Sequence, residues 1–379
     1  MREATRCDWL LLAVLVGCAE ARPDAPPSAL APNALHPLLT IGELESADTH
    51  SDYSEAGPVL LSDMRVVVAD TRSMRIRLLD REGRVVRTTG RSGRGPGEFR
   101  SISWLGRLPD DSVITFDFRL SQFSVFDSNA QFIRSFKLPS PESGRVSWPA
   151  PVAVTAHGQV LLVGNGSLTP PERSGSRIDS TAIFILDPID EVLRLVGRFA
   201  TVVTYSPGTS NRFVTIVPFT SRGLFSVAPG GFAYGHGSRA SVEFYSETGA
   251  FQREVKLDLA PGRPVTDRLV EAYLERRISE SPPDWRESLR SAFRALDLPD
   301  VTPMFDRFLV SSKGEIWVRR FHDGGESATT WQVFDGTGGL LRQFELPAAY
   351  VVLEVRGTRV VGRWRADSGG EMAGVFAVE

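Results

Sequence analysis

The chain has 379 residues, and its 43 Lys and Arg nearly balance its 46 Asp and Glu, leaving a formal net charge of −3 at pH 7. Such a balance gives no whole-chain attraction to nucleic acid or to an anionic membrane surface. Two Cys and five His leave little material for a disulfide framework or a dedicated metal cage. Nucleic-acid binding is therefore not expected.

The N-terminus carries an export pattern. Arg2 and Arg6 precede an apolar run at residues 9–16, which is too short to span a bilayer and suits a secretory signal. The run ends in Leu-Val-Gly-Cys, which resembles the lipobox of bacterial lipoproteins and implies that Cys18 becomes the lipidated first mature residue. An ordinary signal peptide with a chance Cys is the alternative. The resemblance places the protein in the cell envelope, on the periplasmic face of the outer membrane, because Ala19 follows the Cys.

The next segment is a spacer, and the folded domain follows it. Residues 20–37 are rich in Ala and Pro, a composition that cannot bury a core and that behaves as an extended linker. We expect a signal peptide over 1–17, the lipidated Cys and a flexible spacer over 18–37, and one folded domain over 38–379. The membrane contact is then the lipid anchor alone.

A strand unit recurs within the domain. The second strand of one unit ends on Asp70 and is followed by a polar turn, a third strand at 75–79, a turn at 80–83 and a fourth strand at 85–89. The same plan repeats 47 residues later, with Asp117 and Asp127 in place of Asp70 and Asp80. A fixed period in this range with four short strands per unit predicts the blades of a β-propeller.

Six such units fill the chain, which makes the fold class all-β. The last unit shows three strands, at 350–355, 358–363 and 371–378, and lacks an outer one. A lone strand at 38–44 has no neighbour in sequence, and an open ring would expose unpaired edges. We therefore predict a six-bladed propeller closed by this N-terminal strand. The predicted blades begin near residues 58, 102, 151, 223, 306 and 350.

A helical insertion separates blades four and five. Within residues 264–303, apolar positions 269, 270, 273, 274 and 278 follow a helical period, Thr266 is the expected N-cap, and a second helix is expected over 284–296. Its apolar stripe either packs on the propeller or forms a lid or docking surface.

Three stretches of the first blade carry a family resemblance. They read Val-Val-Val-Ala-Asp-Thr-Arg-Ser-Met-Arg-Ile at 66–76, Leu-Leu-Asp-Arg-Glu-Gly at 78–83 and Thr-Gly-Arg-Ser-Gly-Arg-Gly-Pro-Gly-Glu-Phe at 89–99. This pattern is similar to NHL-type six-bladed propellers, in particular their bacterial lipoprotein branch. Blades one and two match closely, four and five loosely, and three and six by strand spacing alone. The family includes binding modules, lyases and lactone hydrolases, so the resemblance implies fold and location but no reaction.

The exits of the second strands are expected to lie on one rim, together with the long connections between blades, and we take this loop-rich rim as the functional face. Polar residues at these exits are candidates for binding a small polar or anionic ligand, with Arg as the bidentate element. The two Asp and His236 could instead hold a cation, or each Asp could simply cap its turn. The candidates are Asp70, Asp117, His236, Arg320 and Arg363.

The sequence thus favours an exported, lipid-anchored, monomeric propeller that binds an envelope protein or a small polar ligand without catalysis and without a cofactor. The alternative is a metal-assisted lyase or lactone or ester hydrolase at the mouth of the propeller channel. In that interpretation His236 is the acid or base, and the acidic pair holds a divalent cation.

Overall fold

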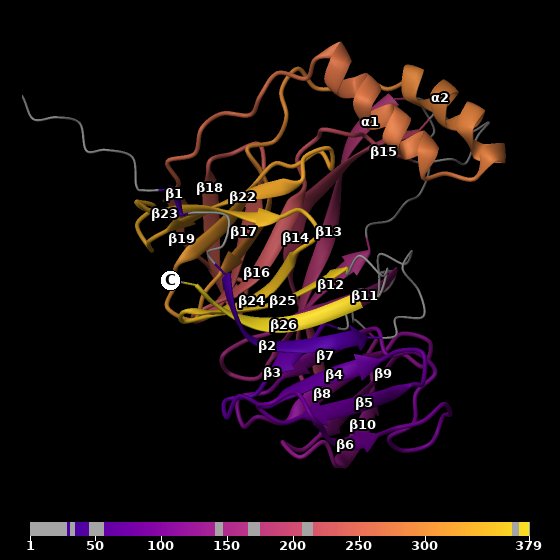
Figure 1. Cartoon of the computed structure of the whole chain (residues 1–379), viewed down its shortest axis with the longest axis vertical. Helices are drawn as coiled ribbons and strands as arrows, with labels where there is room; N and C mark the ends of the chain where they lie inside the picture. Colours follow the sequence, from indigo (N-terminus) through magenta and orange to yellow (C-terminus); the bar gives the residue numbers. More distant parts are fainter. Residues whose placement is uncertain are drawn as a thin grey trace, which may run out of the picture.

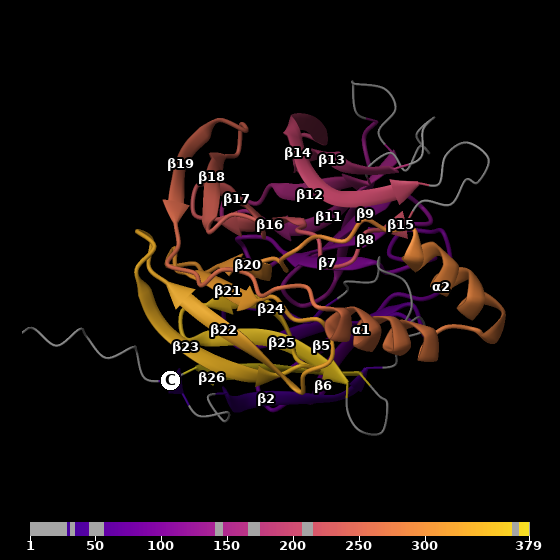
Figure 2. The same cartoon turned by 90° about the horizontal axis from the view of Figure 1, so that it is seen from above.

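The computed structural model describes residues 29–30, 35–44, 57–140, 147–165, 175–206, 215–365 and 371–378. The predicted signal peptide, Cys18 and most of the predicted spacer lie outside these ranges. The described chain forms six antiparallel sheets arranged as the blades of a propeller, with two α-helices in one insertion (Figure 1, Figure 2). The predicted all-β, six-bladed fold is confirmed.

The first two blades have the predicted four strands each. Blade one contains β3 (Val59–Leu60), β4 (Val66–Asp70), β5 (Arg75–Leu79) and β6 (Val85–Thr89). Blade two contains β7 (Trp104–Arg107), β8 (Val113–Asp117), β9 (Gln122–Phe126) and β10 (Phe132–Lys137).

Blades four to six follow the same order. Blade four contains β16 (Gly223–Ala228), β17 (Gly231–His236), β18 (Ser241–Ser246) and β19 (Phe251–Lys256). Blade five contains β20 (Phe305–Val310), β21 (Ile316–Arg320), β22 (Ala328–Phe334) and β23 (Leu340–Pro347). Blade six contains β24 (Val351–Arg356), β25 (Arg359–Arg365) and β26 (Glu371–Val378).

The Asp that ends a third strand fixes the following turn, which explains why the repeat is visible in sequence. Asp80, Asp127 and Asp335 each accept hydrogen bonds from the backbone N–H groups two and four residues later, at 2.7–3.1 Å. In blade four Ser246 takes the same role through its hydroxyl. Asp and Ser suit this position because their short side chains reach nearby backbone donors.

The core lies between the blades. Six clusters of buried apolar side chains are found in the described part of the chain, one for each pair of neighbouring blades. Between blades one and two, for example, Ile76 packs with Phe99 and Phe126. Alternation along each strand supplies apolar side chains to both neighbours, so each blade is buried on two faces. The ring is therefore held by contacts that repeat around it.

An N-terminal strand closes the ring as predicted. β2 (Leu35–Leu44) is the outer strand of blade six and pairs antiparallel with β26. Leu39 and Ile41 are buried between blades six and one, whereas Leu38 and Thr40 are exposed. β2 begins three residues earlier than predicted, and β1 (Ala29–Leu30) pairs in parallel with β23 of blade five. An open sheet edge can pair with extended backbone of any composition. The Ala- and Pro-rich composition of this segment therefore did not predict β1 or the start of β2.

The outer strands of blade three are longer than the sequence predicts. After β11 (Ser147–Val154) and β12 (Val160–Asn165), β13 (Gly175–Asp187) and β14 (Val192–Ser206) pair along their full lengths, and β15 (Thr215–Ile216) adds a fifth strand. From the sequence alone we expect a third strand over 182–187 only, after a long turn at 165–180, and a loop over 198–218. These outer parts of β13 and β14 are mostly half-exposed or exposed, so pairing forms them without an apolar pattern.

The insertion contains α1 (Asp267–Ser279), a short 3₁₀ turn, and α2 (Arg286–Arg294), as predicted. The Thr266 hydroxyl accepts from the backbone N–H of Leu269 at 3.3 Å, which confirms the N-cap. Both helices lie at one end of the molecule, beside β15 (Figure 1). Neither described helix has the length and apolar character needed to cross a membrane.

Candidate functional site

The predicted rim residues stand at or near the ends of second strands. Asp70, Asp117, His236 and Arg320 are the last residues of β4, β8, β17 and β21, and Arg363 lies two residues before the end of β25. Their partners differ from blade to blade, and the differences divide them into turn caps and a smaller candidate site.

Asp70 is buried and is used by the turn after its strand. The backbone N–H of Ser73 donates to one carboxylate oxygen at 2.9 Å, and the Arg77 guanidinium forms an ion pair with the other. Burial acts to raise the pKa of Asp70, but the hydrogen bonds from Ser73 and the positive charge of Arg77 outweigh it, and the pKa lies below its usual range. Asp70 is therefore an ionised cap of the β4–β5 turn.

Asp117 is equally buried and holds the connection between blades one and two. One carboxylate oxygen accepts from the backbone N–H groups of Arg100 at 2.6 Å and Ser101 at 3.0 Å. The other oxygen accepts from the N–H of Leu120 at 2.9 Å. Three backbone donors around one carboxylate fix the incoming chain against the blade. Both predicted acidic ligands thus serve local backbone.

His236 lies half-buried on the rim of blade four. Its Nδ1 is 2.7 Å from the hydroxyl of Ser238. Burial, with the nearby positive charge of Arg239, lowers the pKa of the imidazole below its usual value. The ring is therefore neutral at pH 7 and able both to donate and to accept a proton.

Arg320 holds the backbone that leads into the helical insertion. Its two terminal nitrogens donate to the carbonyl oxygens of Ala260 at 2.7 Å and Pro261 at 3.1 Å. Burial lowers the pKa of the guanidinium from its usual value, although an arginine remains charged at pH 7. Arg320 thus carries a positive charge to a place where its partners are neutral carbonyls.

The structure brings His236 and Arg320 to the same part of the rim. The backbone N–H of Met304 donates to the carbonyl of Gly237 at 2.8 Å, and the N–H of Phe321 donates to the carbonyl of Met304 at 3.3 Å. Each step is about one strand spacing, ~4.8 Å, so the two backbones lie roughly 10 Å apart. We call His236, Ser238 and Arg320 the blade-four/five site.

Asp70 and Asp117 lie apart from this site in the hydrogen-bond network. None of the hydrogen bonds or ion pairs seen in the described ranges links Asp70 or Asp117 to His236 or Arg320. No three His, Cys, Asp or Glu of the described ranges gather closely enough to hold a metal ion. Arg363 lies in blade six, next to residues 366–370, which are outside those ranges.

The insertion is fixed to the rim by contacts that the sequence did not indicate. Arg263 forms ion pairs with Asp323 at 3.1 Å and Glu326 at 2.9 Å, both in the β21–β22 connection. Arg276 of α1 donates to the carbonyl of Asp323. The Tyr273 ring packs edge-on against the Phe219 ring, with centroids 5.1 Å apart. One face of α1 therefore rests on the propeller beside the blade-four/five site.

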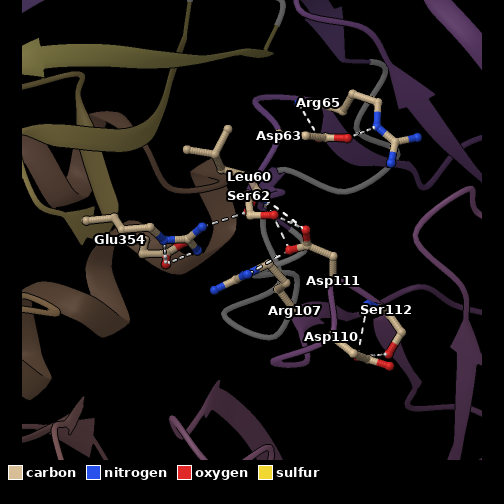
Figure 3. Close-up of polar contacts among 10 residues, drawn as sticks. Leu60, Ser62, Asp63, Arg65, Arg107, Asp110, Asp111, Ser112 and Glu354 are labelled. Atoms are coloured by element: carbon tan, nitrogen blue, oxygen red, sulfur yellow. Dashed lines mark hydrogen bonds and ion pairs between the residues drawn. The ribbon is translucent and has the colours of Figure 1, made fainter.

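A second polar cluster, at the tight turns of blades one and two, was also missed. The backbone and hydroxyl of Ser62 donate to the Asp111 carboxylate, which also accepts from Arg107 at 2.7 Å (Figure 3). Arg356 of blade six donates to the carbonyl of Leu60 at 3.1 Å. These contacts join blades six, one and two, and we call Ser62, Arg107 and Asp111 the blade-one/two clasp. The adjacent acidic pair at 110–111 in a tight turn is the signal that could have indicated it.

Comparison with known proteins identifies the architecture. No family model and no curated protein matches the chain. A solved member of the DUF4221 family from Bacteroides vulgatus is 10% identical with a TM-score of 0.51, over 91% of this chain and 98% of that one. A presumed exported protein from Bacteroides fragilis gives 10% identity and a TM-score of 0.47, over 92% and 96%. A gluconolactonase from Xanthomonas campestris gives 12% and 0.39, over 93% and 99%. At these identities the likeness extends to the propeller fold alone.

Proposed function

We propose that this protein is an exported, lipid-anchored β-propeller that binds an envelope ligand at the blade-four/five site, beside the helical insertion, and that it catalyses no reaction. The observation that supports this most is the distribution of the rim residues. Asp70 and Asp117 bind local backbone N–H groups, whereas His236 and Arg320 lie on the same part of the rim, at the base of the helical insertion. The ligand is an envelope protein or a small polar molecule that offers acceptors to Arg320.

The export part of the proposal comes from the sequence. The short apolar run and the Leu-Val-Gly-Cys ending support cleavage before Cys18 and lipidation there. We expect the Cys18→Ser variant to leave the membrane fraction or to remain uncleaved. Unchanged membrane fractionation of this variant would contradict the lipid anchor, and it would leave the ligand site untouched.

The binding part can be tested by removing the insertion cleanly. Pro264 and Val301 form a β-bridge, so the residues between them can be replaced by a two-residue Asn-Gly turn without separating the strands. We expect this variant to keep the melting temperature of the propeller and to lose an envelope protein that contacts the insertion, whereas a small anion that contacts Arg320 alone should still bind. Thermal shift with sugars, organic anions, peptidoglycan fragments and divalent cations, together with envelope crosslinking, measures the loss. A ligand at 100 times its Kd adds about 2.7 kcal/mol, which a melting curve resolves.

The matched control is the Asp117→Asn variant, which alters another rim residue far from the insertion in sequence. Binding that is lost in this variant and kept in the insertion-deleted one would overturn the proposed location.

A catalytic function is favoured by one observation. His236 is neutral at pH 7 because its pKa is lowered, and its Nδ1 lies 2.7 Å from a serine hydroxyl. A lyase or a lactone or ester hydrolase could use the imidazole as its acid or base. The variants His236→Gln and Ser238→Ala separate the two functions. Loss of turnover with retained binding would establish the enzyme, whereas a ligand recovered chemically unchanged supports the binding protein.

A further inference from the structure

Arg320 differs from its neighbours in what its charge contacts. Arg319, the preceding residue, forms an ion pair at 2.7 Å with a carboxylate of β20, and Arg263 is paired with two carboxylates. Arg320 instead donates to the neutral carbonyls of Ala260 and Pro261. Among the residues that the structure describes, no carboxylate forms an ion pair with it. Its charge is thus partly desolvated but not neutralised.

A guanidinium in this state has stronger partners available to it. Hydrogen bonds to an ionised acceptor are roughly twice as strong as those to a neutral carbonyl, and a carboxylate or phosphate matches the planar fork with two parallel bonds. An anion that reaches Arg320 would therefore compete successfully for the donors that Ala260 and Pro261 now occupy. The imidazole of His236, on the same part of the rim, offers a further polar contact.

The two carbonyls that Arg320 holds belong to the base of the insertion. Directly after them the chain pairs with its own return: the N–H of Val265 donates to Asp300 at 2.8 Å, and the N–H of Thr302 donates to the Arg263 carbonyl at 2.8 Å. At Gly262 a Cβ would lie 1.8 Å from the carbonyl oxygen of Thr302, so the two strands approach too closely for any side chain there. The base is a narrow two-stranded neck, and Arg320 grips its first strand.

The far side of the insertion is held separately. Arg263 contacts Asp323 and Glu326, and Arg276 reaches the carbonyl of Asp323. Arg263 lies in the neck and Arg276 in α1, and both contact the β21–β22 connection, which begins directly after Arg320. The neck and this connection are therefore linked both through Arg320 and through Arg263.

We propose that the helical insertion is a lid controlled by Arg320: a ligand carrying a carboxylate or phosphate takes the guanidinium from the carbonyls of Ala260 and Pro261, and the first strand of the neck loses this attachment to the rim. The inference rests on the proposed function, since it uses the same site, and it adds the ligand class and the coupling. By linkage, a contact that keeps the neck closed lowers the affinity for the anion, and the anion shifts the neck toward the open state by the same factor.

Hydrogen exchange on the full chain tests the coupling, with inorganic phosphate and succinate as the probes. We expect saturating probe to speed exchange of the neck amides, Val265 and Thr302, about fivefold, which is the factor that corresponds to the loss of one hydrogen bond worth about 1 kcal/mol. Exchange in blades one and two should not change. In Arg320→Gln the same amides should exchange fast without probe, and the probe should have no effect.

Two further variants complete the experiment. Arg84→Gln is the matched control, because Arg84 is an arginine of blade one whose ion pair with Asp80 at 2.8 Å does not involve the neck, and it should respond as the native protein does. Arg320→Lys keeps the positive charge but not the bidentate fork, and it should bind the probes at least several-fold more weakly. It serves as the decisive variant if Arg320→Gln does not fold.

The outcomes separate this inference from the function on which it rests. A thermal shift that disappears in Arg320→Gln, with neck exchange unchanged in the native protein, overturns the lid while the binding function stands. A shift by either probe that persists in Arg320→Gln and Arg320→Lys overturns the anion site. No shift by either probe also overturns the anion site, and the proposed function is then decided by whether the insertion-deleted variant loses its crosslinked partner.

Discussion

The blade-one/two clasp allows the sharpest test of what holds neighbouring blades together. Asp111 has a positive φ of 63°, a conformation that costs most side chains about 1 kcal/mol and that Gly adopts freely. Its carboxylate accepts from Ser62 and from Arg107, bonds that together are worth about 2 kcal/mol after allowance for the solvent on one side. Asp111→Ala loses the bonds and keeps the backbone cost, whereas Asp111→Gly loses the bonds but is relieved of that cost.

We therefore expect Asp111→Ala to lower the free energy of unfolding by about 2 kcal/mol, and Asp111→Gly by about 1 kcal/mol. Denaturant unfolding at pH 7 measures both. Burial acts to raise the pKa of Asp111, but the bonds from Ser62 and the charge of Arg107 outweigh it and lower the pKa below 3.8. The stabilisation is thus complete above the unfolded-state pKa and is lost as the pH falls through the folded-state pKa.

Repeating the measurement at falling pH, from 5 to below 3, supplies the decisive comparison. The gap between the native protein and Asp111→Gly should close as the carboxylate takes up its proton. A gap that is equally large at both ends of this range would show that the carboxylate charge contributes nothing. Equal losses in the Ala and Gly variants would refute the backbone part of the reasoning.

Three more predictions concern the ring, the insertion and the rim. Leu39→Ala should lower the free energy of unfolding by about 2–3 kcal/mol, because Leu39 of β2 is buried between blades six and one. The exposed neighbour serves as the control: Thr40→Ala should change the free energy of unfolding by less than about 0.5 kcal/mol. Equal effects of the two substitutions would contradict the closure argument. Thr266→Ala should remove about 1 kcal/mol from α1, seen as faster hydrogen exchange at the amide of Leu269, and unaltered exchange there would show that the cap is idle. His236→Gln should flatten the pH dependence of stability between pH 7 and 5. Because the pKa of His236 is lowered in the folded protein, the unfolded chain binds the proton first, and the native protein loses stability as the pH falls. An unchanged slope would count against burial as the cause of the lowered pKa.

Much of the ring could be predicted because its determinants are local. Asp80 and Asp127 bind backbone two and four residues away, so their spacing in the sequence is the spacing of the turns. The closing strand followed from the missing outer strand of blade six, since an open ring is costly. The helical period and Thr266 located α1 in the same way.

The candidate site was only partly predictable, because its partners are backbone atoms far away in sequence. Arg320 binds the carbonyls of Ala260 and Pro261, and every residue type has a backbone carbonyl, so the sequence does not indicate which residues are its partners. Asp70 and Asp117 stand at positions where a ligand and a turn cap require the same residue, so the pattern alone left both interpretations open. The end of β14 and the start of β13 that pairs with it were not predicted for a related reason: backbone pairing forms them without an apolar pattern.

The pairing of β2 with β26 has a consequence for how the protein is made. A chain that emerges N-terminus first presents β2 long before β26 exists, so the last interface waits for the end of synthesis. Joining segments several hundred residues apart costs about 3 kcal/mol more loop entropy than closing a hairpin, and this cost falls on a single step. Until that step, the edge of β26's sheet and the apolar face that Leu39 will cover stay open to other chains. Chaperones that bind extended, apolar segments would bind at this open edge, and truncated chains that lack β26 would be the species most prone to aggregate.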